Sequence, residues 1–250
     1  MIQKEKIICL GEYYRHYIYS PFKLIRLDEK KGRTKLDTDE YEKNKQYYAE
    51  VAKRCLRDIV LSNLPYGKPR FMTLTYASPQ FSNQKAKENL KLFIKRLRYH
   101  LEEQGHDHRF RYIAVSEQHD SETTDETRRY SYHFHILLFD LPYLRTAFYA
   151  EIWKHGFIKI NLIRGSAFST ASYLTKYLTK TTAHKRGERR YLVSRNVYRP
   201  KEVSFDQLPI LFYVKGVNYP TFTGSMVRVD YYKAQLQEQG ILISNKKNHE

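Results

Sequence analysis

Residues 132–140, with the sequence YHFHILLFD, are central to the architecture because they predict a buried strand that carries two histidines. Side chains alternate between the two faces of a strand, so His133 and His135 share one face while Phe134 lies on the other. The Cα atoms of the two histidines then lie about 6.7 Å apart. Two imidazoles at this spacing can bind one metal ion. In a chain with ten histidines the pair is weak evidence by itself, so its surroundings decide its meaning.

Strand and helix patterns alternate on both sides of this stretch. Together they predict an α+β fold with a central antiparallel sheet and helices packed mainly on one face, as in an RRM-like palm. The expected elements are a helix over 39–64, a strand over 71–76, a helix over 83–104, a strand over 111–116, the histidine strand, a helix over 142–155, a strand over 157–163 and a helix over 166–180.

Three segments are expected along the chain. Residues 1–64 form an N-terminal extension that includes a helix, and residues 65–182 form the core. Residues 183–250 form a basic, β-rich extension packed on that core.

Charge and composition predict a polyanionic partner. The formal net charge is +17, and neutralising phosphates releases condensed counterions. An anionic membrane is the alternative, but the 23 tyrosines and 13 phenylalanines favour unstacked bases of a single strand. The basic face of the helix over 83–104 is interpreted as solvated, with a DNA backbone track as the other reading. Two cysteines and the lack of a long apolar run near residue 1 favour a cytoplasmic protein with no membrane contact.

Glu117 is the expected third ligand beside the two histidines. If the strands over 111–116 and 132–140 form a hairpin, Glu117 lies on the strand next to the histidines, about 4.8 Å away. Two imidazoles and a carboxylate can hold a divalent ion, Mg²⁺ or Mn²⁺, and leave positions open for a phosphate oxygen. Gln118 and His119 are alternative ligands. The second pair, His106 and His108, lies in a polar turn and is interpreted as unrelated to the site.

A doubled motif lies in the helix over 166–180, where YLTK occurs twice in succession over residues 173–180. On a helix Tyr173 and Tyr177 share one face at a spacing of four residues, and Lys176 and Lys180 each follow a tyrosine by three. A phenol is a weak nucleophile at its ordinary pKa of about 10, so it needs a nearby cation and a polarised electrophile. The lysines and a metal-bound phosphate would supply both, which predicts catalytic roles for these four residues.

The motifs FMTLTY at 71–76, Glu117 with HFHILL at 133–138, and the doubled YLTK resemble, in the same order, the three motifs of HUH endonucleases, the rolling-circle replication initiators. The two tyrosines resemble the branch found in small single-stranded DNA phages and related plasmids. Residues 190–200 also resemble a segment that follows the tyrosine helix in such phage proteins. The resemblance covers roughly residues 70–200.

This resemblance implies a metal-dependent nickase and strand transferase. One tyrosine would attack a phosphodiester of single-stranded origin DNA, become linked to the 5′ phosphate and free a 3′ hydroxyl. No phosphate-binding loop motif is present, so a host helicase and a host polymerase are expected partners, with no small-molecule cofactor. The alternatives are an HUH transposase or relaxase, and a non-catalytic module that binds single-stranded nucleic acid.

Overall fold

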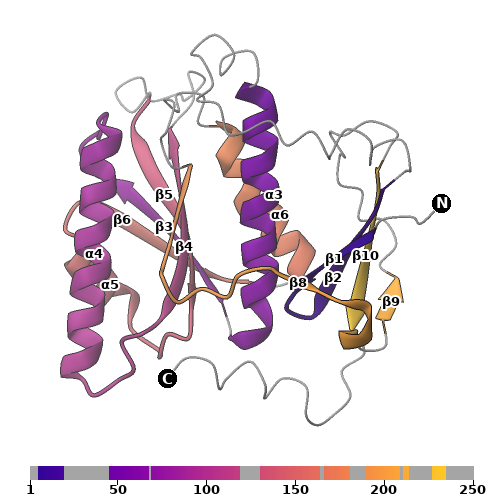
Figure 1. Cartoon of the computed structure of the whole chain (residues 1–250). Helices are drawn as coiled ribbons and strands as arrows, with labels where there is room; N and C mark the ends of the chain where they lie inside the picture. The colour runs from indigo at the N-terminus through magenta and orange to yellow at the C-terminus, as the bar shows by residue number, and fades with distance from the viewer. Residues whose placement is uncertain are drawn as a thin grey trace. The chain divides into compact units, whose positions relative to one another are not determined.

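The computed structural model describes residues 5–19, 45–67, 69–118, 130–163, 166–180, 190–208, 211–213 and 227–234 (Figure 1). The chain divides into two compact units. One is drawn from both ends of the chain, residues 1–33 and 200–250, and the other comprises residues 34–199. The three segments expected from the sequence, with boundaries at residues 64 and 182, stay a prediction.

The unit of residues 34–199 contains the predicted core. Its elements confirm the strand and helix order expected from residue 71 onward. They are α3 (Lys45–Asn63), the 3-10 turn η1 (Leu64–Tyr66), β3 (Arg70–Tyr76), α4 (Asn83–Glu103), β4 (Arg111–Gln118), β5 (Tyr132–Phe139), α5 (Thr146–Trp153), β6 (Gly156–Leu162), α6 (Ala167–Lys180) and β7 (Tyr191–Val193).

The central sheet has the strand order β6-β3-β5-β4-β7, and all neighbours are antiparallel. The histidine strand β5 is its middle strand, and all eight of its residues are buried. In the register, His133 lies opposite Glu117 of β4, and His135 lies opposite Thr73 of β3. The α+β class with a central antiparallel sheet is therefore confirmed.

Helices α4 and α5 cover one face of this sheet. The helix α4 begins after Ser82, whose side-chain oxygen accepts a hydrogen bond from the backbone N–H of Lys85. Its apolar stripe packs on even-numbered residues of β3 and β5, and the Trp153 indole of α5 donates to the Thr75 carbonyl oxygen at 3.2 Å. The buried side chains of β3, α4 and β5 at this face include Met72, Leu74, Leu90, Phe93, Leu97, Leu101, Phe134, Ile136 and Leu138.

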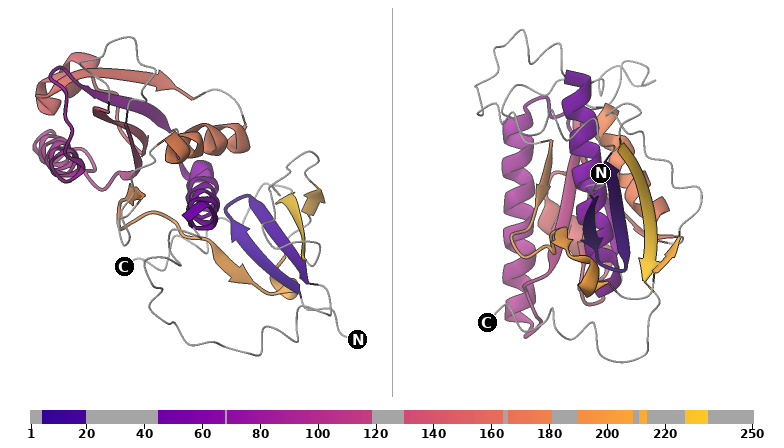
Figure 2. Two further views of the ribbon diagram at one scale, coloured as in Figure 1. Left: turned by 90° about the horizontal axis from the view of Figure 1, so that it is seen from above. Right: turned by 45° about the vertical axis from the view of Figure 1, so that its right-hand side comes forward.

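Helices α6 and α3 lie on the opposite face, and Figure 2 shows the sheet between α4 and α6. Odd-numbered residues of β5 point to this side, among them both histidines and Leu137. The sequence predicted helices mainly on one face of the sheet. The structure has helices on both faces. The reason is that β5 is apolar or buried on both faces, which requires cover on both.

A buried polar network joins α3 to the sheet and to the segment after β7. Asn63 is fully buried, and its side chain makes four hydrogen bonds: it donates to the carbonyls of Ile59 and Tyr198, and it accepts from Arg111 and from the Tyr198 N–H. Arg111 also forms a 2.7 Å ion pair with Asp140. One amide therefore satisfies several buried groups at once.

We expect Asn63→Ala to lower the free energy of unfolding by about 2–4 kcal/mol, because it leaves buried donors and acceptors without partners. Urea unfolding measured by circular dichroism tests this. The matched control is Asn161→Ala, at an exposed position of β6, which should change the unfolding free energy by less than about 0.5 kcal/mol. Equal effects of the two substitutions would show that the network does not stabilise the fold.

The unit formed from both ends of the chain is a second antiparallel sheet, with the strand order β8-β1-β2-β10-β9. Gly11 opens the two-residue turn between β1 and β2 with a φ of 74°, which suits hairpin turns with glycine at the first central position. His16 of β2 bonds to Glu5 of β1 at 2.7 Å. The strands are β1 (Glu5–Leu10), β2 (Tyr13–Tyr19), β8 (Lys201–Val203), β9 (Leu211–Tyr213) and β10 (Val227–Ala234), with the 3-10 turn η3 (Phe205–Gln207) after β8.

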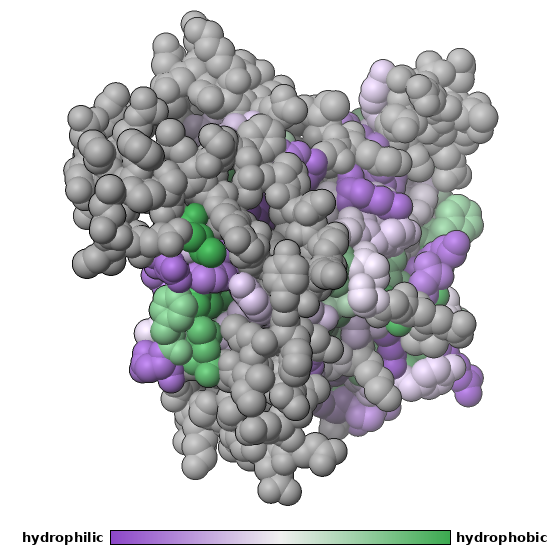
Figure 3. Space-filling model, turned by 90° about the vertical axis from the view of Figure 1, so that its right-hand side faces the viewer, coloured by the Kyte–Doolittle hydropathy of each residue, from purple (hydrophilic) through white to green (hydrophobic). Residues whose placement is uncertain are grey.

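Exposed hydrophobic side chains are scattered over several elements. On the face shown in Figure 3, described hydrophobic residues are visible in several places beside hydrophilic ones. Among the described residues, no helix is both long enough and apolar enough to cross a membrane.

Candidate metal and tyrosine site

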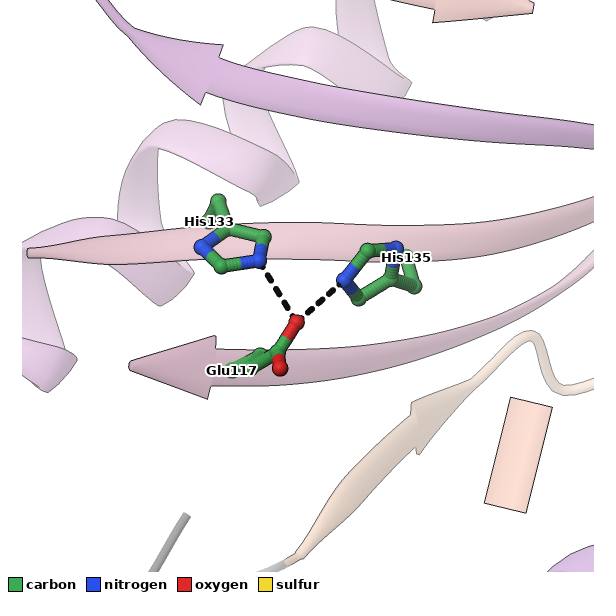
Figure 4. Close-up of side chains that lie close together, drawn as sticks. All are labelled: Glu117, His133 and His135. Carbon is green, nitrogen blue, oxygen red and sulfur yellow. Dashed lines mark hydrogen bonds and ion pairs between the residues drawn. The ribbon is translucent and has the colours of Figure 1, made fainter. Parts of the chain in front are cut away.

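Glu117, His133 and His135 converge on one point between β4 and β5 (Figure 4). The Nε2 atoms of both histidines lie 2.6 Å from the same carboxylate oxygen, Oε2 of Glu117. The potential ligand atoms of the three residues all lie within 4.8 Å of one another. The antiparallel register explains this geometry, because it places Glu117 directly opposite His133 and two residues from the partner of His135.

The three side chains are buried, and this environment shifts the pKa values of Glu117 and His135. Burial alone would raise the pKa of the Glu117 carboxyl, but hydrogen bonds with His133 and His135 outweigh it and hold that pKa well below its ordinary value. Burial lowers the pKa of His135, which favours the neutral imidazole. An ionised carboxylate and a neutral imidazole are the forms in which these groups bind a metal ion.

Thr73 of β3 supports His135 from the other side and was not identified from the sequence. Its hydroxyl oxygen lies 3.3 Å from Nδ1 of His135, so it can fix the ring while Nε2 faces Glu117. In β3, Thr73 alternates with the buried Met72 and Leu74 and therefore lies on the opposite face from them. The missing information was the register, since only the pairing of β3 with β5 shows that this face is the histidine face.

Tyr177 of α6 lies directly on the histidine site. Its ring stacks on the His135 ring with a centroid distance of 3.5 Å and an interplanar angle of 16°. Tyr173 lies one turn earlier, with its ring 5.4 Å from that of Tyr177, and Phe71 of β3 contacts both tyrosines. The structure therefore brings both predicted tyrosines to the metal-ligand candidates.

The two tyrosines differ in exposure. Tyr177 is 7% exposed, whereas Tyr173 is 44% exposed. Burial, together with a hydrogen bond to Tyr173, raises the pKa of the Tyr177 phenol. Its phenol is thus held protonated more firmly than a solvated one, so a cation near the oxygen becomes important for any role as nucleophile.

Lys176 is the cation that contacts the rings of both tyrosines. Its Nζ lies 4.1 Å from the ring centroid of Tyr173 and 5.0 Å from that of Tyr177, so a single ammonium contacts both rings. Lys180 is the last residue of α6, but its side chain lies outside the described part of the structure. Its predicted role therefore stays a prediction.

Of the two alternative ligands, only Gln118 lies among the described residues. Gln118 follows Glu117 on the strand, points to the other face and donates its amide to the Tyr130 carbonyl at 3.2 Å. His119 lies outside the described residues. His106 and His108 lie in the polar stretch after α4, away from β5, as the sequence indicated.

Two imidazole nitrogens and one carboxylate oxygen fit a divalent ion of the type that accepts mixed nitrogen and oxygen ligands. The fit rests on the convergence of three donor atoms in a buried place that is otherwise formed by apolar strands. A carboxylate held by two imidazoles can also be a purely structural ion pair, and metal titration separates the two cases.

One family model matches the part of the chain that contains this geometry. Residues 69–182 match a family model described as a replication-associated protein. The match covers a little under half of the chain, and it contains the triad, both tyrosines and all strands of the sheet except β7. It supports a replication-initiator family. No curated protein and no solved structure matches the chain significantly.

Proposed function

We propose that this protein initiates rolling-circle replication as a metal-dependent endonuclease that nicks and rejoins single-stranded DNA. One observation carries the proposal: the Tyr177 ring stacks on His135 of a buried Glu-His-His triad, within the segment that matches a replication-associated family. A potential nucleophile and a potential metal site thus share one place.

The triad would hold the ion through Nε2 of His133, Nε2 of His135 and a carboxylate oxygen of Glu117. When bound, a divalent ion would polarise the scissile phosphate and stabilise the negative charge that develops on it. Thr73 would keep the His135 ring oriented.

The tyrosines would supply the nucleophile. A phenol oxygen forms a bond to the phosphorus while the bond from phosphorus to the 3′ oxygen breaks, which leaves a 5′ phosphotyrosine and a free 3′ hydroxyl. The phenol loses its proton, and the departing 3′ oxygen gains one. Lys176, close to both rings, would favour the phenolate. Because one phosphodiester replaces another, the reverse attack rejoins the strand.

An HUH transposase or relaxase would use the same residues, and the family match favours replication over these alternatives. A non-catalytic single-strand binder has no need for a buried triad beside two tyrosines. The proposal further includes origin DNA, a host helicase and a host polymerase as partners, and the cytoplasm of a prokaryotic cell as the location.

The test is incubation with circular single-stranded DNA and Mn²⁺, followed by a denaturing gel that detects DNA covalently linked to protein. We expect a linked product that disappears when EDTA removes the metal. Relaxed linear duplex of the same sequence should react at least tenfold more slowly, because stacking hides the backbone geometry that a tyrosine must approach. Efficient linkage in EDTA, or equal rates on duplex, would contradict the proposal.

A further inference from the structure

A basic cleft lies between α4 and β7, on the side of the sheet opposite to the triad. Its volume is about 670 Å³, which is in the range of pockets that bind small ligands. Four cationic side chains line it, and no acidic residue does: the cations are Lys91 and Arg98 of α4, Arg109 before β4, and Arg195 after β7. The proposed nicking chemistry uses none of them.

The cations of this cleft are only partly neutralised. Arg109 pairs with Asp107, and Arg98 packs over the ring of Phe110 at 5.4 Å. Lys91 and Arg195 are exposed, and within the described ranges neither forms an ion pair. Apart from the Arg109–Asp107 pair, no carboxylate among the described residues balances the charges that line the cleft, which favours the binding of an anion.

The wall formed by residues 194–196 is fixed before any ligand arrives. Ser194 exchanges two hydrogen bonds with the backbone of Tyr112, both of 3.0 Å, and Asn196 donates to the Arg109 carbonyl at 2.6 Å. These bonds attach the turn after β7 to the start of β4. The cleft is therefore preformed, which reduces the entropy lost on binding.

The spacing of the cations favours a strand over a single phosphate group. Lys91 and Arg98 lie two turns apart on α4, about 10 Å along the helix axis. Successive phosphates of one strand can contact both cations at this separation, whereas a single phosphate group would engage them less well. Tyr112, half-buried in the cleft, offers a ring edge or face for a base.

We infer that the cleft between α4 and β7 binds the phosphate backbone of a second segment of single-stranded DNA, away from the strand that is cut. The inference rests on the proposed function only for the identity of the polyanion as DNA. It assigns a role to the segment over 190–200. It also assigns part of the basic face of α4 to DNA, where the sequence favoured solvent.

The experiment measures binding of fluorescent dT20 by anisotropy in EDTA, so that no cleavage intervenes. The test variant is Lys91→Ala with Arg195→Ala, and the matched control is Lys85→Ala with Lys95→Ala, two exposed lysines of α4 that do not line the cleft. Each pair removes two positive charges. Unchanged thermal unfolding of both verifies the fold.

We expect the test variant to bind dT20 on the order of tenfold more weakly at low salt, and its plot of log K against log salt to be shallower by about 1.4. The control should stay within twofold of the parent. Hydrogen exchange should show that dT20 protects residues 191–196 in the parent and not in the test variant.

Equal losses in the two variants would overturn the inference, because they would reflect net charge alone. Binding of dTMP as tight as that of dT20 would also overturn it, since the cleft would then be a mononucleotide site. The nicking test is independent of this binding test. If the parent forms protein-linked DNA but the test variant binds dT20 as tightly as the parent, the inference about the cleft is wrong and the proposed function stands.

Discussion

Replacing His135 by alanine is expected to reduce metal-dependent nicking by about 100-fold or more. Loss of a residue that only supports a metal ligand already costs a metal site up to about 100-fold, and His135 would be a ligand itself. The same loss is expected for His133→Ala. The reason is geometric: the Nε2 atoms of both rings lie 2.6 Å from one Glu117 oxygen, so each imidazole would contribute one of three converging ligands. Binding of Mn²⁺ is measured by calorimetry and nicking by the denaturing gel.

The controls separate metal binding from packing. His106→Ala removes a member of the other His-x-His pair, at an exposed position, and should leave Mn²⁺ binding and nicking at parental levels. His135→Gln keeps a polar side chain of similar size in the strand. If it folds as stably as the parent and still loses Mn²⁺ binding, the ligand role is supported. If His133→Ala and His135→Ala both unfold, or if both bind Mn²⁺ as the parent does, the two histidines stabilise the core rather than bind a metal ion.

Glu117→Gln extends the same test to the carboxylate. We expect Mn²⁺ affinity to fall more than dT20 affinity, because the side chain faces the imidazoles and is buried. If the variant and the parent bind Mn²⁺ with equal affinity, the third ligand is a residue other than Glu117.

The sequence alone sufficed to predict the elements of the core because their patterns are local. The apolar stripe of α4 and the alternation in β3 each reflect one helix or strand and its own buried face. The pairing of Glu117 with the histidines also followed from local information, since a hairpin between two adjacent strands fixes which residues can face each other.

Contacts between elements far apart in the chain could not be predicted in the same way. The contact of Thr73 with His135 depends on the register of β3 against β5, which a chain separation of more than sixty residues leaves undetermined by sequence. The preformed cleft depends on β7 pairing with β4, across a similar gap. The stacking of Tyr177 on His135 required the placement of α6 on one particular face of the sheet.

The two tyrosines are expected to act in turn, and removing both should abolish the covalent linkage to DNA altogether. Tyr173→Phe and Tyr177→Phe each remove only a hydroxyl, so the ring contacts with His135, Phe71 and Lys176 are retained. Labelled single-stranded DNA, Mn²⁺ and a denaturing gel measure the linked product. Each single variant should still form it, and the double variant should fall below detection, because phenylalanine has no nucleophile.

The different exposure of the two tyrosines predicts which of them acts first. Tyr173 is 44% exposed, whereas Tyr177 is 7% exposed and stacked on His135, so Tyr173 is the more accessible of the two to incoming DNA. We therefore expect Tyr173→Phe to slow the first linkage more than Tyr177→Phe does, and Tyr177→Phe to impair mainly the second cut that releases a rejoined circle. Tyr47→Phe, which removes the hydroxyl of an exposed tyrosine in α3, is the control.

The decisive outcome is the behaviour of the single variants in both cleavage and joining. Two partly active single variants with an inactive double variant would support two nucleophiles that alternate around one site. If one single variant forms no linked product while the other cleaves and joins like the parent, only one tyrosine is a nucleophile. The second would then position DNA or pack beside the first, and the close contact of Lys176 with both rings would reflect packing rather than shared activation.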